Sequence, residues 1–141
     1  MSAGVRRQGR HFALQLLFSL DLNDTIPVGT AIEECYRRFD LEVVSQAREF
    51  ATNLIEQTRS HLTEIDTMIQ NASRNWRIDR MARVDRNILR LATYELAHCQ
   101  DVPVRVVINE AVELAKRFGS SEASAFVNGV LDRVAQQVRV C

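Results

Sequence analysis

The chain has 141 residues, the length of one ordinary domain, which is enough to bury a packed core. Hydrophobic residues make up 46% of the sequence and charged residues 26%, which predicts a folded protein and excludes a disordered one. The 18 basic residues balance the 18 acidic residues, and this neutrality argues against a protein whose whole surface binds nucleic acid.

Long helices are expected because few residues interrupt the chain. It contains 5 Gly and 2 Pro, and no Pro lies between Pro27 and Pro103. Hydrophobic residues recur at three- and four-residue spacing, which is typical of helices packed on one face. The pattern predicts an all-α fold of about seven helices with short connections, over residues 5–22, 28–39, 43–60, 62–71, 79–98, 104–118 and 121–138.

Three residues are expected to mark boundaries between these helices. Trp76 lies in a short connector and is predicted to pack at the junction of the two halves of the chain. Asp79 has the residue type of an N-cap for the fifth helix. Gly119 follows the sixth helix, where a left-handed backbone is least costly for glycine.

Neither a membrane protein nor a secreted, disulfide-rich protein is expected. The uninterrupted apolar runs are too short for a transmembrane helix, and no signal-peptide cleavage site follows the N-terminal arginines. Cys35, Cys99 and Cys141 are far apart and lack the spacing of a zinc finger. A cytoplasmic protein is the simplest interpretation.

Charge is distributed unevenly along the chain. Residues 1–20 carry three arginines and no acid, whereas residues 21–66 carry ten acids and four arginines. Residues 67–90 then carry six arginines and two aspartates. The two basic segments suit a surface that binds an anion. The acidic segment between them suits a second surface that binds a basic partner. Solvated helix faces are the alternative explanation.

Two patterns resemble catalytic or metal-binding units but are incomplete. Glu95 and His98 have the Glu-x-x-His spacing of di-iron helix bundles, which require a second such unit and two further glutamates. Glu110 and Glu113 lie one turn apart without a neighbouring nucleophile or metal ligand. We therefore expect no enzyme, no cofactor and no metal site, with Glu95 as a buried structural group.

Two groups of residues suit RNA binding. Arg6, Arg7 and Arg10 form an acid-free cluster at the N-terminus, which could follow a phosphate backbone or could be a frayed, charged end. Phe126 lies at the edge of the apolar stripe of the last helix, on the side where Arg133 falls. A half-exposed aromatic beside a cation can stack on an RNA base, and a core position is the alternative.

Four segments, in order along the chain, resemble the NusB family of bacterial transcription antitermination factors. Residues 6–18 read RRQGRHFALQLLF and residues 85–96 read DRNILRLATYEL. Residues 101–116 contain DVP followed by INEAVELAK, and residues 118–132 contain FG followed by FVNGVLD. The resemblance spans the whole chain, with little diagnostic signal in residues 23–75.

This resemblance implies an all-helical fold of two packed three-helix subdomains, residues 1–75 and 76–141. It implies a partner, the small-subunit ribosomal protein NusE, and binding of the pair to the boxA segment of nascent RNA. The complex then helps RNA polymerase to read through terminators, notably in ribosomal RNA operons. Neither catalysis nor a cofactor is implied.

The resemblance also assigns roles to residues of this chain. The N-terminal arginines and the region of Phe126 face RNA, whereas Phe18 and Asp85 match positions that contact NusE. Ala125 stands where some relatives have a basic residue, so the last helix lacks that cation for RNA. Some family members self-associate, so a homodimer is also an expectation.

Two other functions fit the same fold. The first is a protein-only helical scaffold that does not bind RNA. The second is the N-terminal domain of a ribosomal RNA cytosine methyltransferase, which is not expected because the chain has neither a glycine-rich cofactor loop nor a catalytic cysteine motif.

Overall fold

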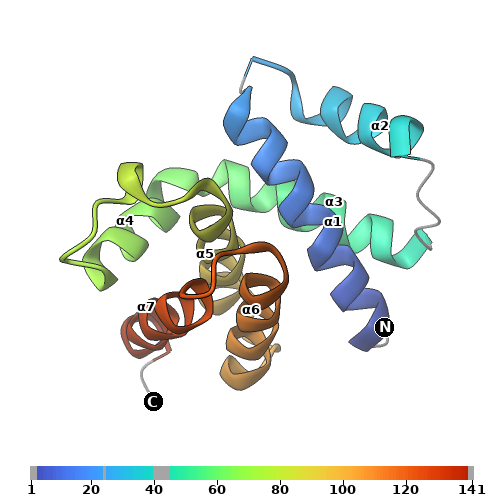
Figure 1. The fold of residues 1–141 in the computed structure, drawn as a ribbon. Helices are drawn as coiled ribbons and strands as arrows, with labels where there is room; N and C mark the ends of the chain where they lie inside the picture. Colours follow the sequence, from blue (N-terminus) through green and yellow to red (C-terminus); the bar gives the residue numbers. More distant parts are fainter. Residues whose placement is uncertain (1–2, 24, 40–44, 140–141) are drawn as a thin grey trace. The chain divides into compact units, whose positions relative to one another are not determined.

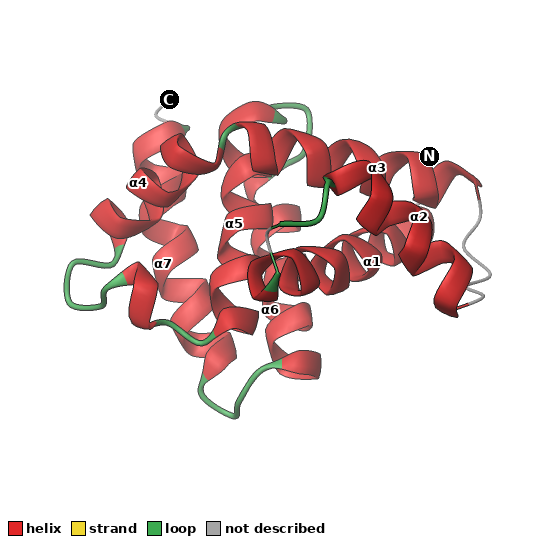
Figure 2. Ribbon diagram, turned by 90° about the horizontal axis from the view of Figure 1, so that it is seen from above, coloured by secondary structure: helices red, strands yellow, loops and turns green. Residues whose placement is uncertain are grey.

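The computed structural model describes residues 3–23, 25–39 and 45–139. These residues form seven α-helices and one short 3-10 helix, with no strand among them (Figure 2). In chain order (Figure 1) the elements are α1 (Ala3–Leu22), α2 (Val28–Phe39), α3 (Ser45–Ser60), α4 (Leu62–Ala72), η1 (Ile78–Arg80), α5 (Arg83–His98), α6 (Val104–Phe118) and α7 (Ala123–Val138). The predicted all-α fold is confirmed. None of these helices has the length and apolar character needed to cross a membrane.

Over the described residues the predicted helices agree with the observed ones to within a few residues, except at the start of α5; the predicted first two residues of the third helix, 43 and 44, lie outside the described residues. Asp79 does not cap this helix, so that prediction is wrong. It lies instead in η1, where its carboxylate accepts a hydrogen bond from Nη2 of Arg77 at 2.8 Å. Met81 and Ala82 follow with extended ψ angles of 150° and 138°, so α5 begins at Arg83.

The chain divides into two compact units, Met1–Arg59 and Ser60–Cys141. This boundary lies one helix earlier than the predicted division near residue 75. The physical reason is that α4 packs on α5 and α7 and therefore belongs to the second unit.

Helices α1 and α3 of the first unit approach closely at Gly9. Gly9 of α1 is buried, and a Cβ atom at this position would lie 2.6 Å from Cδ2 of Phe50 and 3.1 Å from the carbonyl oxygen of Ala47. Glycine is therefore the residue that lets the two helices meet here.

The second unit is built around α5, which contacts α4, α6 and α7 (Figure 1). From Asn87 to Leu96 every residue except Arg90 is buried, including the charged Glu95 as predicted. A helix that is buried on nearly all sides needs internal partners for its polar groups.

Arg139 provides such partners at the end of α5. Its guanidinium donates to backbone carbonyl oxygens, at 2.5–3.1 Å, of Glu95, Leu96, Cys99 and Val102. These carbonyls belong to the last turn of α5 and the turn that follows; those of Glu95 and Cys99 also accept backbone N–H bonds from Cys99 and Val102. A cation at this end also interacts favourably with the helix dipole.

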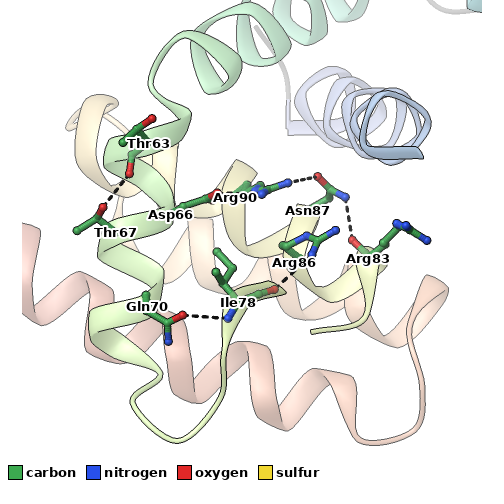
Figure 3. Close-up of polar contacts among 9 residues, drawn as sticks. All are labelled: Thr63, Asp66, Thr67, Gln70, Ile78, Arg83, Arg86, Asn87 and Arg90. Atoms are coloured by element: carbon green, nitrogen blue, oxygen red, sulfur yellow. Dashed lines mark hydrogen bonds and ion pairs between the residues drawn. The ribbon is translucent and has the colours of Figure 1, made fainter. Parts of the chain in front are cut away.

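A second polar network joins α4, η1 and α5 (Figure 3). Arg90 donates through Nε and Nη2 to both carboxylate oxygens of Asp66, at 2.8 and 2.9 Å. Arg86 donates to the carbonyl oxygen of Ile78 at 3.3 Å, while the backbone N–H of Ile78 donates to Oε1 of Gln70 at 3.0 Å. These bonds fix the segment between α4 and α5.

Candidate nucleic-acid interface

Residues 73–82 connect α4 to α5 and hold Trp76 in an exposed position. Nε2 of Gln70 donates to the carbonyl oxygen of Trp76 at 2.9 Å, and the N–H of Trp76 donates to the carbonyl oxygen of Ser73 at 3.0 Å. The side-chain hydroxyl of Ser73 donates to the carbonyl oxygen of Ile69 at 2.8 Å. The backbone is therefore anchored, yet Trp76 is 62% exposed. The prediction that Trp76 packs at a junction is wrong.

Trp76 contacts Phe126 of α7 edge to face. Their ring centroids lie 6.1 Å apart with an interplanar angle of 78°, the geometry that aromatic pairs prefer. Phe126 is half-buried, and the fully buried face of α7 is formed by other residues: Ala123, Val127, Val130, Leu131 and Val134. Phe126 is thus outside the core, at the edge of the apolar stripe, as its helical position indicated.

Two surface cavities adjoin this aromatic pair, and Trp76 lines both. The first has a volume of about 260 Å³ and is lined by Trp76, Phe126 and Asp85, with Arg80 also in its wall. The second has a volume of about 470 Å³ and a polar lining that includes Arg74, Arg133, Gln136 and Gln137. The aromatic pair therefore adjoins one cavity whose lining includes the carboxylate of Asp85 and another whose lining includes Arg74 and Arg133.

Arg133 is exposed but also has a structural contact. Its Nε donates to the carbonyl oxygen of Ala72, at the end of α4. This bond links α7 to α4 and directs the guanidinium into the wall of the larger cavity.

Asp85 lies in the first turn of α5 and is half-buried. Burial raises the pKa of its carboxyl above the ordinary value of 3.8. Part of this burial comes from Gly119, where a Cβ atom would lie 3.2 Å from Oδ1 of Asp85 and 2.7 Å from Cβ of Ala123. Gly119 has φ −96° and ψ −175°, so the expected left-handed conformation is wrong and close packing requires the glycine instead.

The N-terminal arginines occupy the first two turns of α1. Arg7 is exposed and Arg6 is half-buried, so both reach solvent. Arg10 differs from the expected phosphate-binding residue, because it is 6% exposed and its guanidinium lies 5.4 Å from the centroid of the Phe50 ring. This cation–π contact gives Arg10 a packing role in the first unit.

Phe18 lies further along α1 and is half-buried. One turn later on the same side of the helix, Leu22 is 56% exposed. Together they form an apolar strip at the C-terminal end of α1. A half-buried aromatic beside an exposed leucine offers apolar surface to a protein partner.

The carboxylates considered for catalysis occupy ordinary positions on α6. Glu113 is exposed and lies 3.5 Å from Nζ of Lys116, which is an ion pair on a solvated helix face. Glu110 is half-buried on the same helix.

The structure therefore brings part of the predicted site together. Asp85 and Phe126, which were assigned to different partners, line one cavity, and Arg133 lines the next. Sequence reasoning did not include Trp76 or Arg80 in the site. The available signal was an aromatic residue within a connector that carries arginines at positions 74, 77 and 80.

Known proteins resemble this chain in sequence and in fold. The model of the NusB family matches residues 7–136. A transcription antitermination protein NusB from Myxococcus xanthus is 49% identical, over 94% of this chain and 95% of the relative. The solved structure of NusB from T. maritima has a TM-score of 0.85 at 37% identity and covers 94% of this chain and 91% of that chain. A structure of the antitermination factors NusB and NusE in complex with dsRNA has a TM-score of 0.86 at 29% identity, covering 96% and 99%.

Replacing Asp85 with asparagine is expected to raise the free energy of unfolding at neutral pH. Burial raises the pKa of this carboxyl, so its charged form is disfavoured in the folded protein. Such a group destabilises the fold progressively as pH rises from the ordinary value of 3.8 to the folded pKa, and the difference from wild type should vanish below 3.8. Urea unfolding across this pH range measures the effect.

The matched control is Asp132→Asn, which changes an exposed aspartate of α7. It should leave stability within experimental error. An Asp85→Asn protein that is less stable than wild type at neutral pH would contradict the interpretation of Asp85.

Proposed function

The chain belongs to the NusB family, and we propose that it acts as a transcription antitermination factor in the cytoplasm. Together with NusE it binds boxA RNA in nascent transcripts, notably ribosomal RNA, and promotes read-through by RNA polymerase. It acts by binding alone, without catalysis or a cofactor. The relative whose structure was solved with NusE and dsRNA supports this assignment.

The observation that carries the proposal is the Trp76–Phe126 pair, in which Trp76 is exposed and Phe126 is half-buried. Single-stranded RNA is recognised by aromatic side chains on which unpaired bases stack. Trp76 is 62% exposed on an anchored backbone, and Phe126 packs against its edge. Arg74 and Arg133 in the adjacent cavity supply cations for the phosphates that flank a stacked base.

Arg6 and Arg7 give the first unit its own phosphate-binding role. They lie on a segment without acidic residues at the start of α1, and Arg7 is exposed. Arginine forms bidentate contacts with phosphate oxygens, which position RNA without reading its sequence. Arg10 contributes indirectly, because its packing on Phe50 fixes this turn of the helix.

NusE contacts each unit by itself: the apolar strip of Phe18 and Leu22 in the first unit, and the carboxylate of Asp85 in the second. A half-buried aromatic beside an exposed leucine provides an anchor for a partner. The acid suits a basic ribosomal protein. Because Asp85 and Phe126 line the same cavity, the NusE and RNA surfaces adjoin in the second unit.

Substitution of Phe126 tests the stacking role. In the presence of NusE, Phe126→Ala should weaken binding of boxA RNA by about 1–3 kcal/mol, the usual contribution of base–aromatic stacking. Phe126→Leu should lose nearly as much, because it keeps most of the apolar volume and removes the flat ring. Fluorescence anisotropy with labelled RNA measures both affinities.

Three measurements make this result interpretable. Circular dichroism establishes folding, and NusE affinity is measured without RNA, because the two surfaces adjoin. Phe118→Leu, which changes another half-buried aromatic, is the matched control and should bind RNA normally. Wild-type RNA affinity in a folded Phe126→Leu protein would reject the stacking role. No RNA binding by the wild-type complex would favour the protein-only scaffold instead.

Loss of Arg6 and Arg7 should change the salt dependence of RNA binding. The slope of log affinity against log salt concentration should fall by about 0.7 for each lost phosphate contact to single-stranded RNA. Arg105→Ala, which removes an exposed arginine from α6, serves as the control and should leave the slope unchanged. An Arg6→Ala, Arg7→Ala double variant with the wild-type slope would show that these side chains do not contact phosphate.

A further inference from the structure

Two histidines and a glutamate meet in the second unit, where α4 begins and α5 ends. His61 immediately precedes α4, Glu64 lies in its first turn, and His98 lies in the last turn of α5. We propose that His61, Glu64 and His98 bind a divalent transition-metal ion of the zinc class. The proposed RNA and NusE surfaces use none of these three residues.

The geometry is close to that of a metal site. One ligand atom from each residue lies within 4.8 Å of the others. Nε2 of His98 and Oε1 of Glu64 are already 3.2 Å apart. In a tetrahedral zinc site with bonds of about 2.0–2.1 Å, ligand atoms lie about 3.3 Å from one another. The widest pair must therefore close by about 1.5 Å, which rotation of these partly exposed side chains provides.

The two imidazoles are oriented by neighbouring groups. The rings of His61 and His98 have centroids 4.4 Å apart, and Tyr94 stacks on His98 with a centroid distance of 5.2 Å and an interplanar angle of 24°. Nδ1 of His61 lies 3.2 Å from the hydroxyl oxygen of Ser60, within hydrogen-bond distance. Outer contacts of this kind fix the ring of a ligating histidine and so favour metal binding.

The donor set determines which ion fits. Two imidazoles and one carboxylate form the His2Glu set of zinc sites that keep an open coordination position. Imidazole favours zinc, nickel or copper ions over magnesium and calcium ions, which prefer oxygen ligands. His61 and Glu64 also line an open surface depression of about 630 Å³, so a water molecule can reach the remaining position.

The proposed ligand is Glu64, whereas the Glu-x-x-His spacing in the sequence involves Glu95. Glu95, three residues before His98, is buried in α5, whereas Glu64 reaches His98 from another helix. Cys99 is the neighbouring thiol, but burial raises its pKa and so disfavours the thiolate that binds metals. A bound ion would link the start of α4 to the end of α5 and stabilise the second unit.

Calorimetric titration of the metal-depleted, untagged full-length chain with zinc chloride tests the proposal. We expect saturable binding of one zinc ion per chain and no comparable binding of magnesium. His61→Ala and His98→Ala should each lower zinc affinity at least tenfold, since even outer contacts of a metal site typically contribute about 10–100-fold. Glu64→Gln should also weaken binding. Cobalt(II) absorption provides a second readout, because tetrahedral coordination and thiolate ligation have distinct bands.

Two control variants separate this site from other ligands. His11→Ala removes the third histidine of the chain, and Cys99→Ala removes the neighbouring thiol; both should bind zinc like wild type. Circular dichroism establishes folding, and His98→Gln replaces His98→Ala if the latter does not fold. Absence of saturable zinc binding, wild-type affinity in the folded histidine variants, or loss of binding in Cys99→Ala would overturn the proposal.

Discussion

The burial of α5 is the constraint on which the second unit depends. Its residues from Asn87 to Leu96, apart from Arg90, are removed from solvent by α4, α6 and α7. A helix in this environment must satisfy its polar groups inside the protein. Arg139 does so at the C-terminal end by donating to four carbonyl oxygens. Arg90 joins the helix to α4 through a bidentate bond with Asp66, a geometry that lysine cannot reproduce.

The same arrangement explains how the candidate interface is held before any ligand binds. The segment between α4 and α5 is tied at Gln70 and Arg86, so the backbone of Trp76 is fixed while its ring faces solvent. A preorganised aromatic surface loses less conformational entropy on binding than a mobile one. The carboxylate of Asp85 is half-buried, and this burial raises its pKa. Burial of the charged form is unfavourable for stability. A group kept in such an environment is consistent with a role in binding a partner. Arg90 and Arg139 are used within the structure, whereas Arg133 both bonds to the carbonyl oxygen of Ala72 and lines an interface cavity.

Local patterns in the sequence were sufficient for the fold class and for most helix boundaries. Helical periodicity also placed Phe126 correctly at the edge of a buried stripe. The periodicity of a single helix does not predict which residues of different helices come into contact. Arg10 lies in an arginine cluster yet packs on Phe50, a residue forty positions away, and Asp79 pairs with Arg77 instead of capping α5. Glu64 and His98 come together only through the packing of α4 on α5. The roles in binding assigned to the site residues are still predictions: Arg6, Arg7, Phe18, Asp85, Phe126 and Arg133.

We propose that the aromatic pair formed by Trp76 and Phe126 receives an RNA base. Trp76 is the single tryptophan of the chain, so its emission reports directly on this surface. Fluorescence of the complex with NusE should be measured during titration with boxA RNA, with the Trp76→Phe complex as the blank for emission from the partner. Saturable quenching of Trp76 emission is expected as a base stacks on the pair. Emission that stays unchanged when anisotropy shows the RNA to be fully bound would contradict it.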